Sequence, residues 1–334
     1  MIDWVSAILP CSHDASALID GFVMSFDAKG DQQWIINKKL TVEGSYSSKI
    51  QIKSHTDHQI YISGNPAKFL QGHNLFGTDD LTYLMGRFFD SLLDQDIGLC
   101  PTSDQYEAIQ AGDYHLTRVD ATQSWHLKDK NEVAAWIRAT GQTARLKHRG
   151  SGQFTGDTAY FGKNSRRWGV KCYSKGSEIL AKGHQLPKEL QIPEMLQFAD
   201  KSLRIELVIR QLELKRRGLD LASNWTGETA RMLLQTMFLD NLELSDNMII
   251  QTDVLDTLIP RLRLVYQSWV AGDDLKQILP KNTFYRYRRQ LLEHGIDISI
   301  VQTESRSNVV PLVRYLEAQP VGIPDWAYTK RLVA

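Results

Sequence analysis

The first 65 residues alternate between apolar and polar positions, which is the pattern of strands with one buried face. The alternation runs through IDWVSAIL, GFVMSF, SKIQIKS and QIYIS, and the turn signals AKGD and VEGS separate these runs. Side chains on a strand point alternately to its two faces, so each run offers one apolar face to a core. This part of the chain predicts a meander of strands.

A helical period follows between residues 79 and 95. The positions that recur on one helical face are Leu81, Leu84, Phe88, Leu92 and Leu93. Asp79 and Asp80 suit the N-terminal end of this helix, where negative charge is favourable. The segment before it, SGNPAKFLQGHNLFG, is predicted to be a loop-like connection.

Strands and helices then mix without a strict order. Strands are predicted near residues 115–127, 157–161, 168–173 and 203–212, and a helix near 131–140. This order favours an α+β fold with a mixed or antiparallel central sheet. After Gly218 the apolar spacing becomes helical, in GETARMLLQTMFLDNLEL and the segments that follow it. We therefore predict a sheet-based domain over residues 1–218 and a mainly helical region over 219–334.

Three of the predicted strands carry charged or phenolic side chains in the middle of one face. Alternation groups Arg118 with Asp120, Lys171 with Tyr173 and Lys175, and Arg204 with Glu206 and Arg210. If the strands share a sheet, two carboxylates, a tyrosine and several cations meet on one surface, which suits phosphoryl transfer. Carboxylates are the ligands that Mg²⁺ prefers. Each strand taken alone is also typical of an ordinary solvated face, so the spacing leaves both interpretations open.

Total charge leaves nucleic-acid binding undecided. The chain has 39 basic and 39 acidic residues, and its formal net charge is zero. Basic residues nevertheless gather in Arg145–Arg149, Lys163–Lys175, Lys215–Arg217 and Tyr285–Arg289. Each of these stretches could meet the phosphates of a nucleic acid. Local basic surfaces are therefore expected on a neutral protein.

Cysteine content and hydropathy exclude several classes of protein. The three cysteines, Cys11, Cys100 and Cys172, form no C-x-x-C pair, which argues against a disulfide framework or a structural zinc site. No apolar stretch approaches the roughly 20 residues of a membrane helix, and the first residues lack the pattern of a signal peptide. We expect a globular protein of the cytoplasm.

The sequence resembles the replication initiators, or nicking proteins, of filamentous bacteriophages. The segments that carry the resemblance are NPAKFLQGHNLFGTDDL at 65–81, TRVDAT at 117–122, YSK at 173–175, LRIEL at 203–207 and NVVPLVRY at 308–315. The stretch YFGKNSRRWGVKCYSKGSE followed by LRIELVIR is also similar to the initiators of a class of rolling-circle plasmids. In those initiators the nucleophilic tyrosine occupies the position of Tyr173.

The resemblance implies an enzyme that binds double-stranded origin DNA and nicks one strand through Tyr173. It would keep the 5′-phosphate end, leave a 3′-hydroxyl for a host polymerase, and later join the displaced single strand. A host helicase is a further expected partner, and the cytoplasm of the host bacterium is the expected location. Two alternatives stay open: a non-catalytic DNA-binding regulator of phage replication, and a metal-dependent nuclease that activates water.

The resemblance also assigns roles to site residues. Asp120, Glu206 and His73 are the expected ligands of Mg²⁺ or Mn²⁺, and Lys171 and Lys175 would favour the Tyr173 phenolate. Many rolling-circle nickases carry two histidines separated by one residue, whereas here His73 is followed by Asn74. The metal site must then be built differently, or assembled mainly from Asp120 and Glu206. His73 could ligate the ion, contact phosphate or hold its loop.

Further basic residues are expected to hold DNA. Lys163, Arg166 and Arg167 would contact phosphates, and a helix after a turn at Pro280–Asn282 would present Arg286, Arg288 and Arg289 as in helix-turn-helix proteins. A solvated basic helix is the alternative for this last segment. Tyr160 could be a second nucleophile for the closing step or an ordinary core or stacking aromatic.

Overall fold

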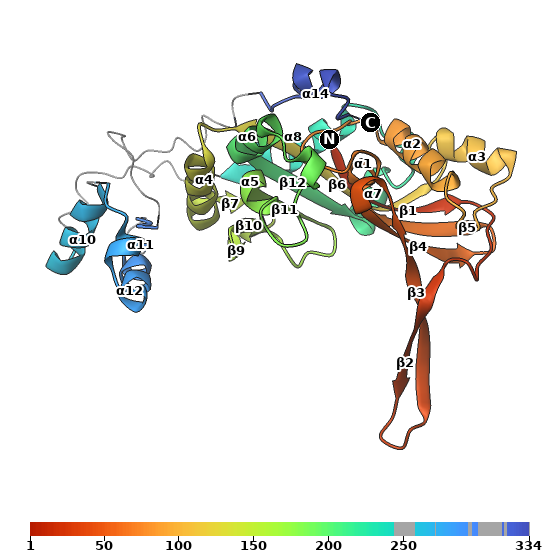
Figure 1. The fold of residues 1–334 in the computed structure, drawn as a ribbon, viewed down its shortest axis with the longest axis horizontal. Helices are drawn as coiled ribbons and strands as arrows, with labels where there is room; N and C mark the ends of the chain where they lie inside the picture. Colours follow the sequence, from red (N-terminus) through yellow and green to blue (C-terminus); the bar gives the residue numbers. More distant parts are fainter. Residues whose placement is uncertain (244–257, 271, 293–295, 300–315, 317–318, 334) are drawn as a thin grey trace.

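The computed structural model describes residues 1–243, 258–270, 272–292, 296–299, 316 and 319–333. It has an α+β fold, as predicted, built on a ten-stranded sheet with the order β2-β3-β4-β5-β1-β6-β12-β11-β10-β9 (Figure 1). Neighbouring strands of this sheet pair antiparallel. Strand β1 lies between β5 and β6, so the meander of the first 65 residues adds one continuous half to the sheet.

The strands of the large sheet are β1 (Ile2–Pro10), β2 (Ile19–Phe26), β3 (Gln32–Glu43), β4 (Lys49–Thr56), β5 (Gln59–Gly64), β6 (His115–His126), β9 (Gln153–Thr155), β10 (Thr158–Phe161), β11 (Trp168–Ser174) and β12 (Ser202–Arg210). A small sheet joins β13 (Leu242–Glu243), β7 (Arg145–Leu146) and β8 (Gly150–Ser151). The described α-helices are α1 (Pro66–Gln71), α2 (Leu81–Leu93), α3 (Ser103–Gln110), α4 (Lys130–Thr143), α5 (Lys175–Glu178), α6 (Pro193–Lys201), α7 (Gln211–Arg217), α8 (Thr229–Met237), α10 (Pro260–Val270), α11 (Leu275–Ile278), α12 (Lys281–Leu292) and α14 (Asp325–Thr329).

One face of the sheet is apolar and is covered by helices. Its core includes Val119 of β6 and Leu207 of β12, and helices α2, α4 and α8 add Phe88, Trp136 and Leu234 to the same buried cluster. Each fully buried side chain of this kind stabilises the fold by about 1.5–3 kcal/mol relative to exposure. The other face carries the polar residues of the alternating pattern, and this difference fixes the register of the strands.

The predicted helix over residues 79–95 is confirmed as α2. Asp80 is its N-cap and accepts a hydrogen bond of 2.9 Å from the backbone N–H of Tyr83. The predicted loop before it was wrong for residues 66–71, which form α1. Asn65 caps α1 and Pro66 fills its first turn, a start signal that the glycines of the segment obscured.

Strands β2 and β3 form a hairpin that stands away from the rest of the sheet (Figure 1). Its large apolar side chains are exposed on both faces: Phe22, Val23, Met24, Phe26, Trp34, Ile35 and Ile36. The last third of β3, from Leu40 to Glu43, pairs with β4 and so joins the hairpin to the sheet. The projecting part of the hairpin therefore contributes nothing to the core.

The C-terminal part of the described chain is mainly helical. Helix α8 packs into the core of the large sheet, whereas α10, α11 and α12 bury Trp269, Leu275 and Phe284 in a cluster of their own. Gly218 ends α7 with a φ of 67°, but the boundary predicted there stays a prediction. The segment NVVPLVRY, residues 308–315, lies outside the described residues. Within the described residues, we found no helix long and apolar enough to cross a membrane.

Candidate active site

Strands β6, β12 and β11 lie side by side, so their polar faces form one surface. The register pairs Glu206 with Thr122 on one side and with Lys171 on the other, and it pairs Tyr173 with Arg204. Directly opposed residues on antiparallel strands point to the same face. The sheet therefore brings together the mid-strand acids, the tyrosine and the cations that alternation placed on three separate strands.

These residues line a cavity of about 580 Å³. Asp120, Lys171, Tyr173 and Glu206 form part of its wall, and Asp3 of β1 joins them. The sequence analysis missed Asp3, although it is a single acid within an apolar strand, the same signal that marks Asp120 and Glu206. Its place in the wall follows from a register shift of β1 between Ile2 and Trp4.

Tyr173 is buried, and its hydroxyl donates a hydrogen bond of 3.3 Å to Glu206 Oε2. Burial raises the pKa of Tyr173 well above the ordinary phenol value, and the negative charge of Glu206 adds to this effect. The cation that opposes the rise in pKa is Arg204, its cross-strand partner. The phenol is therefore neutral in this arrangement and needs a base to ionise.

Glu206 is the titratable group with the most suitable position to act as that base. Burial and the nearby charge of Asp120 raise the pKa of Glu206 to about 8, while Lys171, which is ion-paired with it, acts in the opposite direction. Asp120 is held by Arg118 through contacts of 2.8 and 2.5 Å. A carboxylate with a raised pKa is a stronger proton acceptor than an ordinary glutamate.

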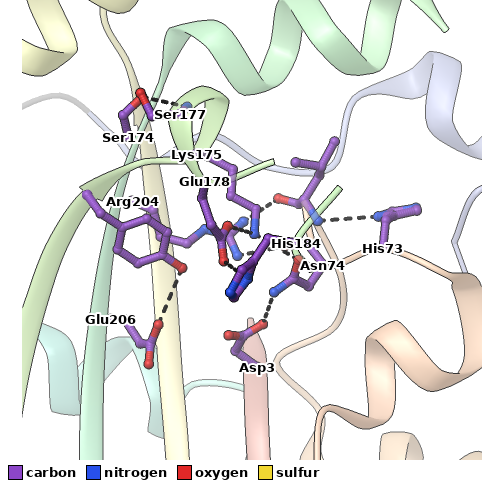
Figure 2. A network of polar contacts seen from close by, with 12 residues as sticks. Asp3, His73, Asn74, Ser174, Lys175, Ser177, Glu178, His184, Arg204 and Glu206 are labelled. Atoms are coloured by element: carbon purple, nitrogen blue, oxygen red, sulfur yellow. Dashed lines mark hydrogen bonds and ion pairs between the residues drawn. The ribbon is translucent and has the colours of Figure 1, made fainter. Parts of the chain in front are cut away.

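Lys175 lies directly after β11 and is buried. Its Nζ donates a 2.8 Å hydrogen bond to Asn74 and is ion-paired with Glu178 (Figure 2). Burial and the charge of Arg204 lower the pKa of Lys175. Neither Lys175 nor Lys171 bonds to the Tyr173 hydroxyl, because each is occupied by a glutamate.

Asn74 connects this lysine to the acid on β1. Its amide donates a 2.8 Å hydrogen bond to Asp3 Oδ1 (Figure 2). The same oxygen also accepts a hydrogen bond of 2.7 Å from Asn65. Burial disfavours the charged form of Asp3, but Arg204, Lys175 and these amides outweigh it, so its pKa lies below the ordinary value. Asp3 is therefore a negative charge fixed in the cavity wall.

Arg204 fastens the loop after α1 to the sheet. Its guanidinium donates to the carbonyl oxygens of Asn74 and Leu75 at 2.6 and 2.5 Å, and to Ser124 Oγ at 3.2 Å. The side chain is buried, with only 1% exposed. Alternation placed Arg204 on the polar face, but the contact with residues 74 and 75 joins segments too distant in sequence for any local pattern to reveal.

His73 lies behind this loop and does not line the cavity that contains Asp120 and Glu206. Its Nε2 contacts the carbonyl oxygen of Leu332 at 2.8 Å, and its Nδ1 accepts from the backbone N–H of Leu75 at 3.3 Å. Burial lowers the pKa of His73 to about 4. Both ring nitrogens are thus engaged in holding the loop to the C-terminal segment.

The carboxylates of Asp120 and Glu206 would suit a magnesium ion whose remaining ligands come from a substrate phosphate and water. Among the described residues, no three His, Cys, Asp or Glu side chains gather closely enough to hold a metal ion by themselves. Mg²⁺ is commonly bound through one or two carboxylates, with phosphate and water oxygens completing its shell. Asp120 and Glu206 supply two carboxylates, and the charge of one raises the pKa of the other. A divalent cation would relieve this repulsion.

Two family models match the chain, and together they span most of it. The model of the N-terminal part of the phage replication-associated proteins matches residues 1–228, and the model of their C-terminal part matches residues 255–333. The chain belongs to this family of replication-associated proteins. The resemblance to filamentous phage initiators is thereby confirmed at the level of the family.

Two relatives illustrate the range of this family. The chain is 36% identical to the replication-associated protein of Enterobacteria phage I2-2, over 97% of this chain and 96% of that protein. It is 27% identical to the replication-associated protein of Enterobacteria phage M13, over 80% and 76% of the two chains. A solved rolling circle replication initiator protein from Geobacillus stearothermophilus shares 13% identity and a TM-score of 0.30, covering 76% and 89%. A TM-score this low says nothing about a shared fold.

The basic residues predicted to bind DNA differ in whether they already have partners within the protein. Lys163 bonds to Thr155 at 2.7 Å and lies 4.9 Å from the ring centroid of Tyr160. Arg167 is ion-paired with Glu213 at 2.9 Å, while Arg166 is exposed. Tyr160 pairs across the strands with Lys171, so it lies on the same face as the cavity residues.

The predicted helix after Pro280 is α12, which begins at Lys281. Arg288 is held by Asp297 through contacts of 2.8 and 2.9 Å, so it serves the packing of this region. Arg286 and Arg289 are exposed on the helix. These two arginines are the ones that an approaching phosphate could reach.

Proposed function

We propose that this protein is an origin-specific DNA nicking and strand-joining enzyme that initiates rolling-circle replication of phage DNA. The observation that supports this most is the buried Tyr173, hydrogen-bonded to a glutamate of raised pKa in a cavity that also contains Asp120 and Asp3. Membership of a replication-associated family agrees with it.

In the proposed reaction, Tyr173 Oη attacks the phosphorus of the scissile phosphodiester. The phenol proton passes to the ionised form of Glu206, whose Oε2 accepts a hydrogen bond from the phenol. The bond between phosphorus and the 3′ oxygen breaks, and the leaving oxygen takes a proton from water. The 5′-phosphate is then a diester of Tyr173, which keeps the free energy of the cut bond for joining, so no nucleotide is consumed.

Asp120 and Glu206 are the residues that would hold Mg²⁺ or Mn²⁺. The ion would make the scissile phosphate more electrophilic and stabilise its developing charge. Of the three roles considered for His73, we assign it the structural one, since both ring nitrogens bond within the protein. Lys171 and Lys175 orient Glu206 and Asn74, and Arg204 is the cation that favours the Tyr173 phenolate.

The remaining basic residues would bind DNA outside the reacting centre. Lys163 and Arg166 would contact phosphates beside β11. Arg286 and Arg289 of α12 would contact the phosphates of the double-stranded origin. The 3′-hydroxyl would be extended by a host polymerase while a host helicase opens the duplex, in the cytoplasm of the host bacterium. Arg167 and Arg288 already have acidic partners, so they position neighbouring residues instead.

A nicking assay separates this function from its alternatives. Supercoiled DNA that carries the phage origin is incubated with protein and Mg²⁺, and nicked circles are expected with DNA covalently attached to protein. Tyr173→Phe should lower the rate by at least about 10³-fold, while Tyr160→Phe, on the same face, should still nick. Nicks without attached protein would indicate a nuclease that uses water, and the absence of nicks would indicate a non-catalytic regulator.

A further inference from the structure

A row of polar side chains crosses the open face of the sheet from the candidate active site to β3. The row begins at Arg118, whose guanidinium lies 5.3 Å from the ring of Trp4. The indole of Trp4 donates to Ser6, and Ser6 bonds to Ser63 at 2.8 Å. The members lie on β6, β1 and β5, which are adjacent in the sheet. The row therefore runs across the strands rather than along one of them.

The row ends at Tyr61 of β5, which lies between two lysines of the next strands. Lys39 Nζ is 5.0 Å from the centroid of the Tyr61 ring, and Lys53 Nζ is 5.4 Å from it. Burial opposes ionisation of Tyr61, but the hydroxyls of Ser6 and Ser63 interact with its hydroxyl and lower its pKa, so the ring is held beside these two serines. We call Tyr61, Lys39 and Lys53 the Tyr61 patch.

The lysines of the Tyr61 patch differ from those cations of this face that already have acidic partners. Lys49 is paired with Glu43, and Arg118 and Lys171 are likewise paired with carboxylates. Lys39 and Lys53 have no carboxylate within 4.0 Å among the described residues of the chain. Two unneutralised cations beside a fixed aromatic ring form a surface that is complementary to phosphates and bases together.

We propose that the Tyr61 patch binds an unpaired DNA strand that leads to Tyr173. The proposal rests on the nicking function, because it places the patch on the path of the strand being cut. A base stacks on Tyr61, and the phosphates on either side of that base meet Lys39 and Lys53. The patch acts in binding and takes no part in the bond exchange.

The distance between the patch and the nucleophile suits a strand of several nucleotides. Four strand intervals separate β5 from β11 in the sheet, and at roughly 4.8 Å each they amount to about 19 Å across the strands. The register aligns Tyr61 with His115 of β6 and Tyr173 with Ser124 of β6, and these nine residues add about 31 Å along the strands. The two offsets combine to about 36 Å, which about eleven stacked nucleotides would span at about 3.4 Å each. The patch thus binds DNA beyond the scissile position and adds affinity without altering the chemistry.

Binding is tested by fluorescence anisotropy with labelled oligothymidine of about 20 nucleotides, longer than the estimated span of about eleven. The protein is Tyr173→Phe without metal, so no cleavage occurs. Tyr61→Ala should weaken binding roughly 5- to 150-fold, the usual effect of losing one stacking platform. Tyr61→Phe keeps the ring and should bind within about twofold of the parent. Lys39→Gln with Lys53→Gln should weaken binding and reduce the salt slope by about 1.4.

Matched controls are Tyr83→Ala, an exposed tyrosine on α2, and Lys128→Gln with Lys130→Gln at the start of α4. They should leave affinity unchanged, and melting temperatures verify that each variant is folded. If folded Tyr61→Ala binds DNA normally and the wild type nicks DNA, the proposed role of the Tyr61 patch is wrong. The proposed function of the protein is then unaffected. If the wild type neither binds the oligothymidine nor nicks origin DNA, both the proposed patch and the proposed function are wrong. Light scattering tests whether the Tyr61 patch binds a second copy of the chain instead. If Tyr61→Ala dissociates a dimer and leaves DNA affinity unchanged, this face is a dimer interface and the proposed DNA binding is wrong.

Discussion

Glu206 determines the electrostatics of the candidate site at the scale of single residues. Its pKa is about 8 in the folded protein, against an ordinary value of 4.5, with burial as the main cause. The folded state therefore binds the extra proton between these two pH values. The resulting stabilisation is complete below about pH 4.5 and is lost as the pH rises to about 8.

We therefore predict that Glu206→Gln removes this pH dependence. Relative to wild type, the variant should gain about 4 kcal/mol in free energy of unfolding between pH 5 and pH 8.5, since no buried charge has to form. Urea denaturation in the presence of a metal chelator measures the gain at both pH values. Glu189→Gln, an exposed glutamate, is the control and should show none. A Glu206→Gln variant that parallels wild type at both pH values would contradict the assigned pKa.

Residue patterns anticipated the polar surface but not the contacts that build it. Alternation identified Asp120, Glu206 and Tyr173 because a strand's face depends only on local spacing. The roles of Arg204 and His73 depend on contacts with Asn74 and Leu332, and such pairs leave no trace in local periodicity. Asp3 could have been found by the rule used for the other acids.

At the scale of elements, the projecting part of the β2–β3 hairpin adds nothing to the core of the sheet. Its exposed side chains include Phe26 and Ile36, each 58% exposed. Replacing residues 21–38 by an Asn-Gly turn should change the free energy of unfolding by less than about 1 kcal/mol, because no core contact is lost. The shortened protein should also aggregate less.

Denaturation curves and light scattering on the shortened and full-length proteins check this expectation. A matched substitution within the core, Ile62→Ala in β5, should cost about 2–5 kcal/mol. If the shortened protein loses as much stability as Ile62→Ala does, the hairpin is part of the cooperative core after all.

Several elements with clear periods were predicted correctly, the four-residue strand β10 among them, whereas several short helices were not. Helices α2 and α4 and strands β6, β11 and β12 agree with their predicted positions. The sequence analysis assigned no helix to α1, α3 or α6, which have six, eight and nine residues. So few turns carry little amphipathic signal, and their start residues, Asn65, Thr102 and the proline at 193, gave the better indication.

At the scale of the whole molecule, the segment of residues 319–333 packs against the sheet-based part of the chain. Ala327 is buried with Phe76 and Phe198, and Leu332 contacts His73. Deleting residues 319–334 should lower the free energy of unfolding by about 2–4 kcal/mol, because the apolar side chains beneath it become exposed. Urea denaturation measures the change, and a deletion without effect would show that the contact adds nothing to stability.

The arrangement of the whole sheet could not be predicted from the sequence. The α+β class follows from the order of elements, but β1 pairs with both β5 and β6, which are far from it in the chain. Register and strand order depend on many weak long-range contacts that act together. The candidate site exists only because this order makes β6, β12 and β11 neighbours.

The proposed reaction depends on Tyr173 forming the bond to DNA. Protein trapped with a labelled origin oligonucleotide can be digested and its DNA-linked peptide identified by mass spectrometry. The account predicts a phosphodiester on Tyr173, in the peptide that contains WGVKCYSK. A linkage to Tyr160, or to any other residue, with Tyr173 unmodified would contradict it.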